Sequence, residues 1–203
     1  MAKNKAKIAD DVSNGAEGGI STGEPYLVEF EIEGVSDILF HAWDSDAVEA
    51  KGKAPKGSQE KKSDNVESYV VRNKHKEIVL PATYMRAAIV ESARFEQDPR
   101  SPRKCFRDLA KASFIVESDA SLGKDEWDYL HRCRVVIQRN AVPRQRPAFH
   151  VGWTATFTIQ VILAEYLPER LLRKLIDNCG KLVGIGDYRP TYGRFVVKNW
   201  KRL

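Results

Sequence analysis

Apolar and polar positions alternate in two segments of the chain, and this period of two predicts half-buried β-strands. In residues 26–33 every even position is apolar and most odd positions are glutamate, and we expect this strand to continue past Gly34 through residues 38–40. In residues 151–163 every odd position is apolar, so one face of this strand meets a core and the other meets solvent or a ligand. Two further strands are expected at residues 112–117 and 194–200.

Apolar positions three and four residues apart predict two helices and a shorter third one. The first covers about residues 83–95, with Met85 and Ile89 on its apolar face. The second starts at Pro168, which suits a first helical position, and should stop at Gly180. A short helix is expected at residues 103–111.

In chain order these elements read strand, helix, strand, strand, helix, strand. That order predicts an α+β fold of the ferredoxin-like (RRM-like) βαββαβ type, with an antiparallel sheet and helices on one face. The apolar alternation at Cys133, Val135 and Ile137 adds a middle strand or a central hairpin that extends from the sheet.

The polar stretches set the expected domain organisation. Residues 1–24 contain no apolar period and read as a disordered tail, so residues 25–203 form a single domain. Residues 44–76, just after the first strand, are rich in Lys, Glu, Ser, Gly and Asp, and we expect them to be a mobile loop insertion.

Composition narrows the class of protein. The first residues lack the apolar segment of a secretory signal, and no stretch approaches the roughly 18 apolar residues of a membrane span, so we expect a cytoplasmic protein with no membrane partner. The three cysteines lie far apart, and none of the four histidines is spaced from another as metal ligands on a helix would be. We therefore expect no metal and no cofactor.

Basic residues gather in two segments, although the net charge of +5 is mild. Residues 131–146 hold no acidic residue and five arginines, whose planar guanidinium groups suit bidentate contact with phosphate. These are Arg132, Arg134, Arg139, Arg144 and Arg146. The second segment, residues 99–111, holds Arg100, Arg103, Lys104, Arg107 and Lys111. The alternative is that both segments are solvated surface.

A third candidate for phosphate binding is the segment between the second helix and the last strand. Its candidate residues are Gly184, Gly186, Arg189, Tyr192, Gly193 and Arg194. Glycines allow a backbone N–H to approach an anion closely, while the arginines supply charge and the tyrosine a stacking face. The segment fits neither a dinucleotide-binding fingerprint nor a P-loop, and the alternative is a structural turn.

Catalytic candidates are few. Asp44 and Asp46 follow the first strand, where a carboxylate could contact a scissile phosphate, and His41 lies just before them. Solvated loop aspartates are the commoner interpretation of such a pattern.

Two short motifs resemble the RAMP superfamily of CRISPR-associated proteins. Residues 78–89, with the sequence IVLPATYMRAAI, resemble its strand and Pro-small-small box at the first helix, and residues 184–196 resemble its glycine-rich loop. Phe195 departs from the pattern of the RNA-processing nucleases, which often have glycine there. The chain is most similar to the backbone subunits that polymerise along a guide RNA.

The resemblance implies roles for individual residues. Thr83 and Arg86 would approach the RNA backbone at the first helix, and Gly184, Gly186, Arg189 and Arg194 at the loop. Some members cleave target RNA with an aspartate in the first long loop, which would point to Asp44 or Asp46.

The leading hypothesis is therefore a non-catalytic subunit that binds single-stranded RNA, or DNA, and self-associates into a filament or a hetero-complex. A phage or mobile element is one expected origin. Two alternatives stay open: a metal-independent endoribonuclease, and a phage protein that binds or anneals single-stranded DNA or serves in assembly. All of them depend on the hairpin arginines and the glycine segment converging on one surface.

Overall fold

The structure of the protein is a computed structural model that describes residues 23–55, 65–137 and 140–203. All but the end of the predicted tail, residues 1–24, lies outside these ranges. The strands are β1 (Tyr26–Gly34), β2 (Ile38–Leu39), β3 (Val71–Arg72), β4 (Ile78–Leu80), β5 (Phe114–Val116), β6 (Ala120–Ser121), β7 (Tyr129–Ile137), β8 (Asn140–Phe149), β9 (Thr154–Val161) and β10 (Phe195–Arg202). The helices are α1 (Ser45–Lys53), α3 (Ala82–Ser92), α4 (Arg107–Ser113) and α5 (Glu169–Asn178), with 3-10 turns η1 (Val66–Tyr69) and η2 (Ala93–Phe95) and a π-helical turn η3 (Cys179–Val183).

The main sheet confirms the expected α+β fold. Its four strands run in the order β10-β1-β9-β5, and every neighbouring pair is antiparallel. Numbered by their position in the chain, these are the fourth, first, third and second strands of a βαββαβ unit, with α3 and α5 as its two helices. This is the ferredoxin-like arrangement that the order of elements predicts.

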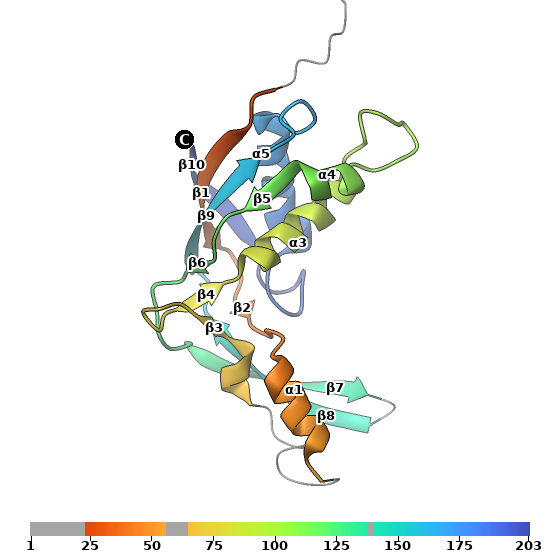
Figure 1. Ribbon diagram of the computed structural model, residues 1–203. Helices are drawn as coiled ribbons and strands as arrows, with labels where there is room; N and C mark the ends of the chain where they lie inside the picture. Colours follow the sequence, from red (N-terminus) through yellow and green to blue (C-terminus); the bar gives the residue numbers. More distant parts are fainter. Residues whose placement is uncertain (1–22, 56–64, 138–139) are drawn as a thin grey trace, which may run out of the picture.

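The two faces of this sheet differ sharply in chemistry. Alternate residues of β1 are buried, and Phe30 stacks on Phe157 of β9 with their ring centroids 6.0 Å apart. Figure 1 shows α3, α4 and α5 on one side of the sheet, where they cover this apolar face. The other face carries Glu29, Glu31 and Glu33 in successive outward positions of the central strand β1. On the neighbouring strand β10, Lys198 lies 2.8 Å from Glu33 and Lys201 pairs in register with Glu29, so the open face carries charges of both signs.

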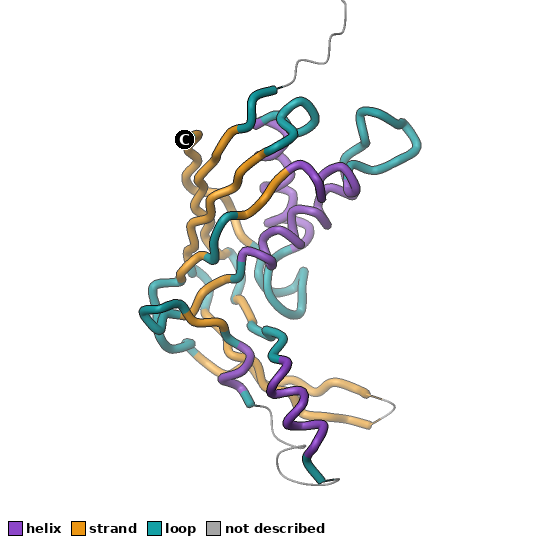
Figure 2. The backbone as a smooth tube through the Cα atoms, in the orientation of Figure 1, coloured by secondary structure: helices purple, strands orange, loops and turns teal. Residues whose placement is uncertain are grey.

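The segment after β1 departs from the predicted strand. The chain turns after Gly34, and Ile38–Leu39 pair with β8 instead of continuing β1. They belong to a second sheet of order β2-β8-β7, whose strands β7 and β8 form the expected central hairpin. Ile38 and Leu39 are fully buried, so their apolar character reflects a second core region. Figure 2 shows this hairpin and α1 forming an extension from the main sheet.

Residues 44–76, expected as a mobile insertion, contain α1, η1 and β3 in their described parts. The short strand β3 pairs with β4, and β4 with β6, in a third small sheet. Whether this segment is mobile in solution stays a prediction.

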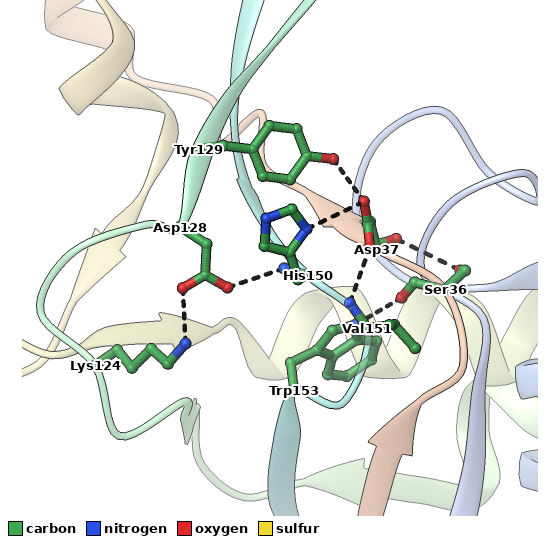
Figure 3. A network of polar contacts seen from close by, with 8 residues as sticks. All are labelled: Ser36, Asp37, Lys124, Asp128, Tyr129, His150, Val151 and Trp153. Atoms are coloured by element: carbon green, nitrogen blue, oxygen red, sulfur yellow. Dashed lines mark hydrogen bonds and ion pairs between the residues drawn. The ribbon is translucent and has the colours of Figure 1, made fainter.

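A network of polar contacts around Asp37 joins the hairpin to the main sheet (Figure 3). The carboxylate of Asp37 accepts a hydrogen bond from the Tyr129 hydroxyl at 2.7 Å and another from the Val151 amide at 2.9 Å. The Trp153 indole donates to the carbonyl of Ser36 at 2.9 Å. These contacts link the β1–β2 turn, strand β7 and the β8–β9 turn, so they fix how the hairpin leaves the sheet.

The end of the second helix differs from the prediction that Gly180 stops it. Helix α5 passes directly into the π-helical turn η3, and Gly184, with φ +75°, follows that turn. A Cβ atom on Gly180 would lie 2.2 Å from the carbonyl oxygen of Phe195. Glycine at this position therefore serves the close approach of η3 to β10. In the described ranges, no helix has the length and apolar character needed to cross a bilayer.

Candidate nucleic-acid interface

The glycine-rich loop after η3 depends on its glycines for its shape. Gly184, Gly186 and Gly193 have φ values of +75°, +89° and +72°, which residues with side chains rarely adopt. A Cβ atom would lie 2.6 Å from the Leu39 carbonyl oxygen at Gly186, and 1.7 Å from the Ile185 carbonyl oxygen at Gly193. The structural-turn alternative therefore accounts for all three glycines.

The backbone amides of this loop are largely engaged within the protein. Those of Asp187 and Gly193 donate to the carbonyls of Leu39 and Asp37 at 2.8 and 2.7 Å, and that of Ile185 donates to Gly193 at 2.9 Å. These N–H groups do not point at a ligand, contrary to the reasoning from glycine composition. Contact with phosphate must come chiefly from the side chains of the loop.

The loop packs against the base of the hairpin, as the sequence argument requires. The Arg146 guanidinium on β8 donates to Asp187 in the loop at 2.8 Å. The Cys133 sulfur lies 2.9 Å from the Tyr188 hydroxyl, and burial, followed by this contact, raises the pKa of Tyr188 to about 12. The rings of His131 and Tyr192 lie 5.2 Å apart, which adds an aromatic contact. Two segments far apart in the chain thus form one continuous surface.

Only some hairpin arginines share that surface. Arg146 and Arg144 pair in register with His131 and Cys133, so these four residues lie on the face toward the loop. Arg132 and Arg134 alternate with them and are exposed on the opposite face. Arg139 lies outside the described residues. Arg144 and Arg146 therefore lie on the loop side of the hairpin, whereas the structure corrects the expected convergence for Arg132 and Arg134. The Arg146 side chain is 7% exposed and bound to Asp187, so it joins the hairpin to the loop and does not present its charge to a phosphate.

A groove runs between α3 and the glycine-rich loop. Its helix wall presents Ala87, Glu91 and Arg94, its loop wall runs from Leu182 to Pro190, and Arg107 of α4 joins them. The groove has a volume of about 620 Å³. It connects with a smaller pocket of about 190 Å³, because both include Ala87 and the loop residues Gly186, Asp187 and Arg189. His41 and Tyr84 complete that pocket. We call the groove and the pocket together the α3 groove.

Two of the arginines predicted to contact RNA donate hydrogen bonds to backbone carbonyls of the protein itself. The Arg86 guanidinium donates to the carbonyl of Lys111 at 2.7 Å and so ties α3 to α4. The Arg194 guanidinium donates to the carbonyl of Pro190 at 2.7 Å within the loop. Thr83 is exposed at the start of α3 but is not among the lining residues of the α3 groove. Among the arginines carried over by the family resemblance, Arg189 is the one that lines the groove.

The basic residues of segment 99–111 lie in two different places. Arg107 lines the α3 groove, whereas Arg100, Arg103 and Lys104 lie on the loop between η2 and α4. Figure 1 shows this loop beyond α4, at the opposite end of the molecule from the β7–β8 hairpin. Arg100 binds Asp98 through two side-chain hydrogen bonds of 3.1 and 2.8 Å. The three segments therefore do not form one basic surface.

The Asp98–Arg100 pair predicts a specific dependence of stability on pH. The side-chain hydrogen bonds of Arg100 lower the pKa of Asp98 to about 2. In the unfolded chain this pKa returns to about 3.9, so the pair contributes stability that is complete above about pH 5 and is lost as pH falls toward 2. In Arg100→Gln, the free energy of unfolding should be lower than in the wild type near neutral pH, and it should fall less between about pH 4 and pH 2. Denaturant titrations at several pH values measure this, and an Arg103→Gln variant whose pH profile changed as much would contradict it.

The catalytic candidates occupy different places. His41 lines the pocket of the α3 groove, with its Nδ1 3.7 Å from an Asp187 carboxylate oxygen and its ring 4.7 Å from that of Tyr69. Asp44 accepts a hydrogen bond from the Asp46 amide at 3.0 Å at the start of α1. Asp44 lines a separate groove beside η1, so the aspartates and His41 do not meet in one pocket. Among the residues with described side chains, no three His, Cys, Asp or Glu residues are grouped as a metal site requires.

Sequence reasoning missed part of the groove. Tyr84, Glu91 and Arg94 line it but were not among the predicted site residues. The signal that could have found them is helical spacing, because residues 84, 87, 91 and 94 recur every three or four positions and lie on one side of the helix, beside its apolar face.

No protein-family model and no curated protein matches this sequence. Among solved structures, a chain of "Cryo-EM structure of the Type III-B Cmr-beta bound to cognate target RNA" is similar, with a TM-score of 0.48 and 12% sequence identity. The similarity covers 89% of this chain and 61% of that chain, so the present chain spans less than two thirds of that chain's length. Similarity at this level carries no argument about function.

Proposed function

We propose that the protein is a non-catalytic subunit that binds single-stranded RNA and oligomerises along a guide-type RNA in a CRISPR-like ribonucleoprotein. The observation that carries the proposal is the α3 groove, in which Arg94, Arg107 and Arg189 from three different elements line one channel. The resemblance of residues 78–89 and 184–196 to the RAMP superfamily supports the same function, because both motifs border this groove.

The length and the lining of the groove suit a short stretch of a single strand. Its helix wall extends from Tyr84 to Arg94, which is roughly 15 Å at the rise of an α-helix. A few nucleotides of an extended strand match this length. Tyr188 lines the groove, and an aromatic side chain there can stack on an unpaired base.

Binding of labelled single-stranded RNA, followed by fluorescence anisotropy at several salt concentrations, tests the proposal. We expect wild-type affinity to fall steeply with salt, and Arg189→Gln to weaken binding about tenfold and reduce the salt slope by about one. Arg103→Gln, on the loop beyond α4, is the matched control and should bind as the wild type does. Binding that is absent at low salt, or indifferent to salt, would exclude the proposed function.

Competitors and the state of the RNA address the two alternatives. Stronger competition by single-stranded DNA than by RNA would favour the phage DNA-binding protein. Cleavage of the labelled RNA that is lost in His41→Ala would favour the endoribonuclease. For self-association, we expect the purified protein to carry nucleic acid and to become smaller by light scattering after ribonuclease treatment.

A further inference from the structure

At the outer end of the α3 groove, two arginines converge on one carboxylate. The Arg94 guanidinium binds one oxygen of Glu91 at 2.6 Å, and the Arg107 guanidinium lies 3.2 Å from the other. Arg94 follows Glu91 by three residues on α3 and η2, while Arg107 is the first residue of α4. Two helices therefore aim positive charge at a single point in the groove.

Both arginines of this cluster can still bind another anion. The Arg94 and Arg107 side chains are 54% and 48% exposed, and each guanidinium has five N–H donors, of which one carboxylate oxygen occupies only a part. The Arg94 guanidinium carbon also lies 4.7 Å from the centre of the exposed Phe95 ring, which adds a cation–π contact.

The cluster is too exposed to be explained by stability. Ion pairs between exposed side chains contribute little to folding, because water screens them and the side chains lose entropy. The charges of the cluster instead favour the binding of an anion, because two arginines and one glutamate leave a net charge of +1. Arg189 lines the same groove and adds a further positive charge. An arrangement that already fits a carboxylate between two guanidiniums also fits the oxygens of a phosphate.

We infer that Arg94 and Arg107 form a binding site for an internal phosphate of the RNA strand, and that Glu91 occupies this site in the free protein as a built-in competitor. The inference rests on the proposed function and specifies where one phosphate sits. The strand displaces the Glu91 carboxylate and takes over its two arginines. A single phosphate competes poorly with a tethered carboxylate, whereas a strand is also held by Arg189, so the site favours a polymer over a free nucleotide.

Substitutions of opposite sign test the inference by anisotropy with a labelled single-stranded RNA lacking a 5′-phosphate. Arg94→Gln and Arg107→Gln should each weaken binding about tenfold and lower the salt slope by about one. Glu91→Gln should tighten binding about fivefold, because the amide no longer competes for the guanidiniums with a full charge. Thermal unfolding of each variant confirms that it is folded.

Two controls make the test specific. Arg103→Gln removes an equal charge outside the groove, and Glu117→Gln neutralises an exposed glutamate at the end of β5. The inference is overturned if Glu91→Gln weakens binding or matches Glu117→Gln, or if both groove arginines match Arg103→Gln while wild-type protein still binds RNA. It is also overturned if only a 5′-phosphorylated RNA responds to the arginine variants, since the site would then hold a terminal phosphate. If the wild-type protein does not bind RNA at all, both the proposed function and this inference are excluded.

Discussion

Replacing Gly193 by alanine is expected to destabilise the protein by about 4 kcal/mol, a loss large enough to indicate a specific steric cause. Gly193 has φ +72°, and the left-handed backbone costs about 1–2 kcal/mol for a residue with a Cβ atom. The new Cβ atom would also lie 1.7 Å from the Ile185 carbonyl oxygen. This oxygen belongs to the backbone, so a side-chain rotation cannot remove the clash. The loop backbone must therefore move, and its hydrogen bond from the Gly193 amide to Asp37 is weakened.

Gly123→Ala is the matched control for this prediction. Gly123 has a similar φ of +67°, but nothing lies within 4 Å of the position of its Cβ atom. This variant should lose only the conformational cost, about 1 kcal/mol, so the difference between the two variants isolates the clash. Urea unfolding of both proteins measures it. Equal losses would mean that the loop backbone is not packed as the structure shows.

The order of the elements was predictable from the sequence because local patterns determine it. The alternation in β1 and β9 and the apolar stripes of α3 and α5 each come from one sheet face or one helix face meeting the main core. The prediction was wrong at Ile38 and Leu39, which are apolar because a second sheet buries them. A short apolar run shows that residues are buried, but it does not show which sheet buries them.

The site was only partly predictable, because it depends on contacts between distant segments. The glycine-rich loop was identified, yet its amides bind Leu39 and Asp37, residues that precede it by some 150 positions. Charge runs were a weaker guide, since residues adjacent in a strand face opposite ways. Arg132 and Arg146 belong to one basic segment but lie on opposite faces of the hairpin.

The ion pair between Arg146 and Asp187 should be the strongest polar link between the hairpin and the glycine-rich loop. The Arg146 side chain is 7% exposed and Asp187 is 28% exposed, with 2.8 Å between their charged atoms. Asp187→Asn leaves a buried guanidinium without its counter-charge, and we expect a loss of about 3 kcal/mol in the free energy of unfolding. Asp187 accepts from the Tyr188 amide with one oxygen and from Arg146 with the other, and asparagine has only one acceptor oxygen. If that oxygen keeps the Tyr188 bond, the NH2 group faces the guanidinium, so the loss reports the charge and its hydrogen bond together.

Arg146→Met should cost less, about 1 kcal/mol, because methionine fills the space beside Tyr69 and the remaining carboxylate reaches solvent. The double variant Arg146→Met with Asp187→Asn should then be more stable than Asp187→Asn alone, since no unpaired buried charge remains. Urea unfolding of the wild type, the two single variants and the double variant gives the coupling energy directly. Additive losses would show that the two charges do not interact, and that other contacts, such as Cys133–Tyr188 and His131–Tyr192, hold the hairpin to the loop.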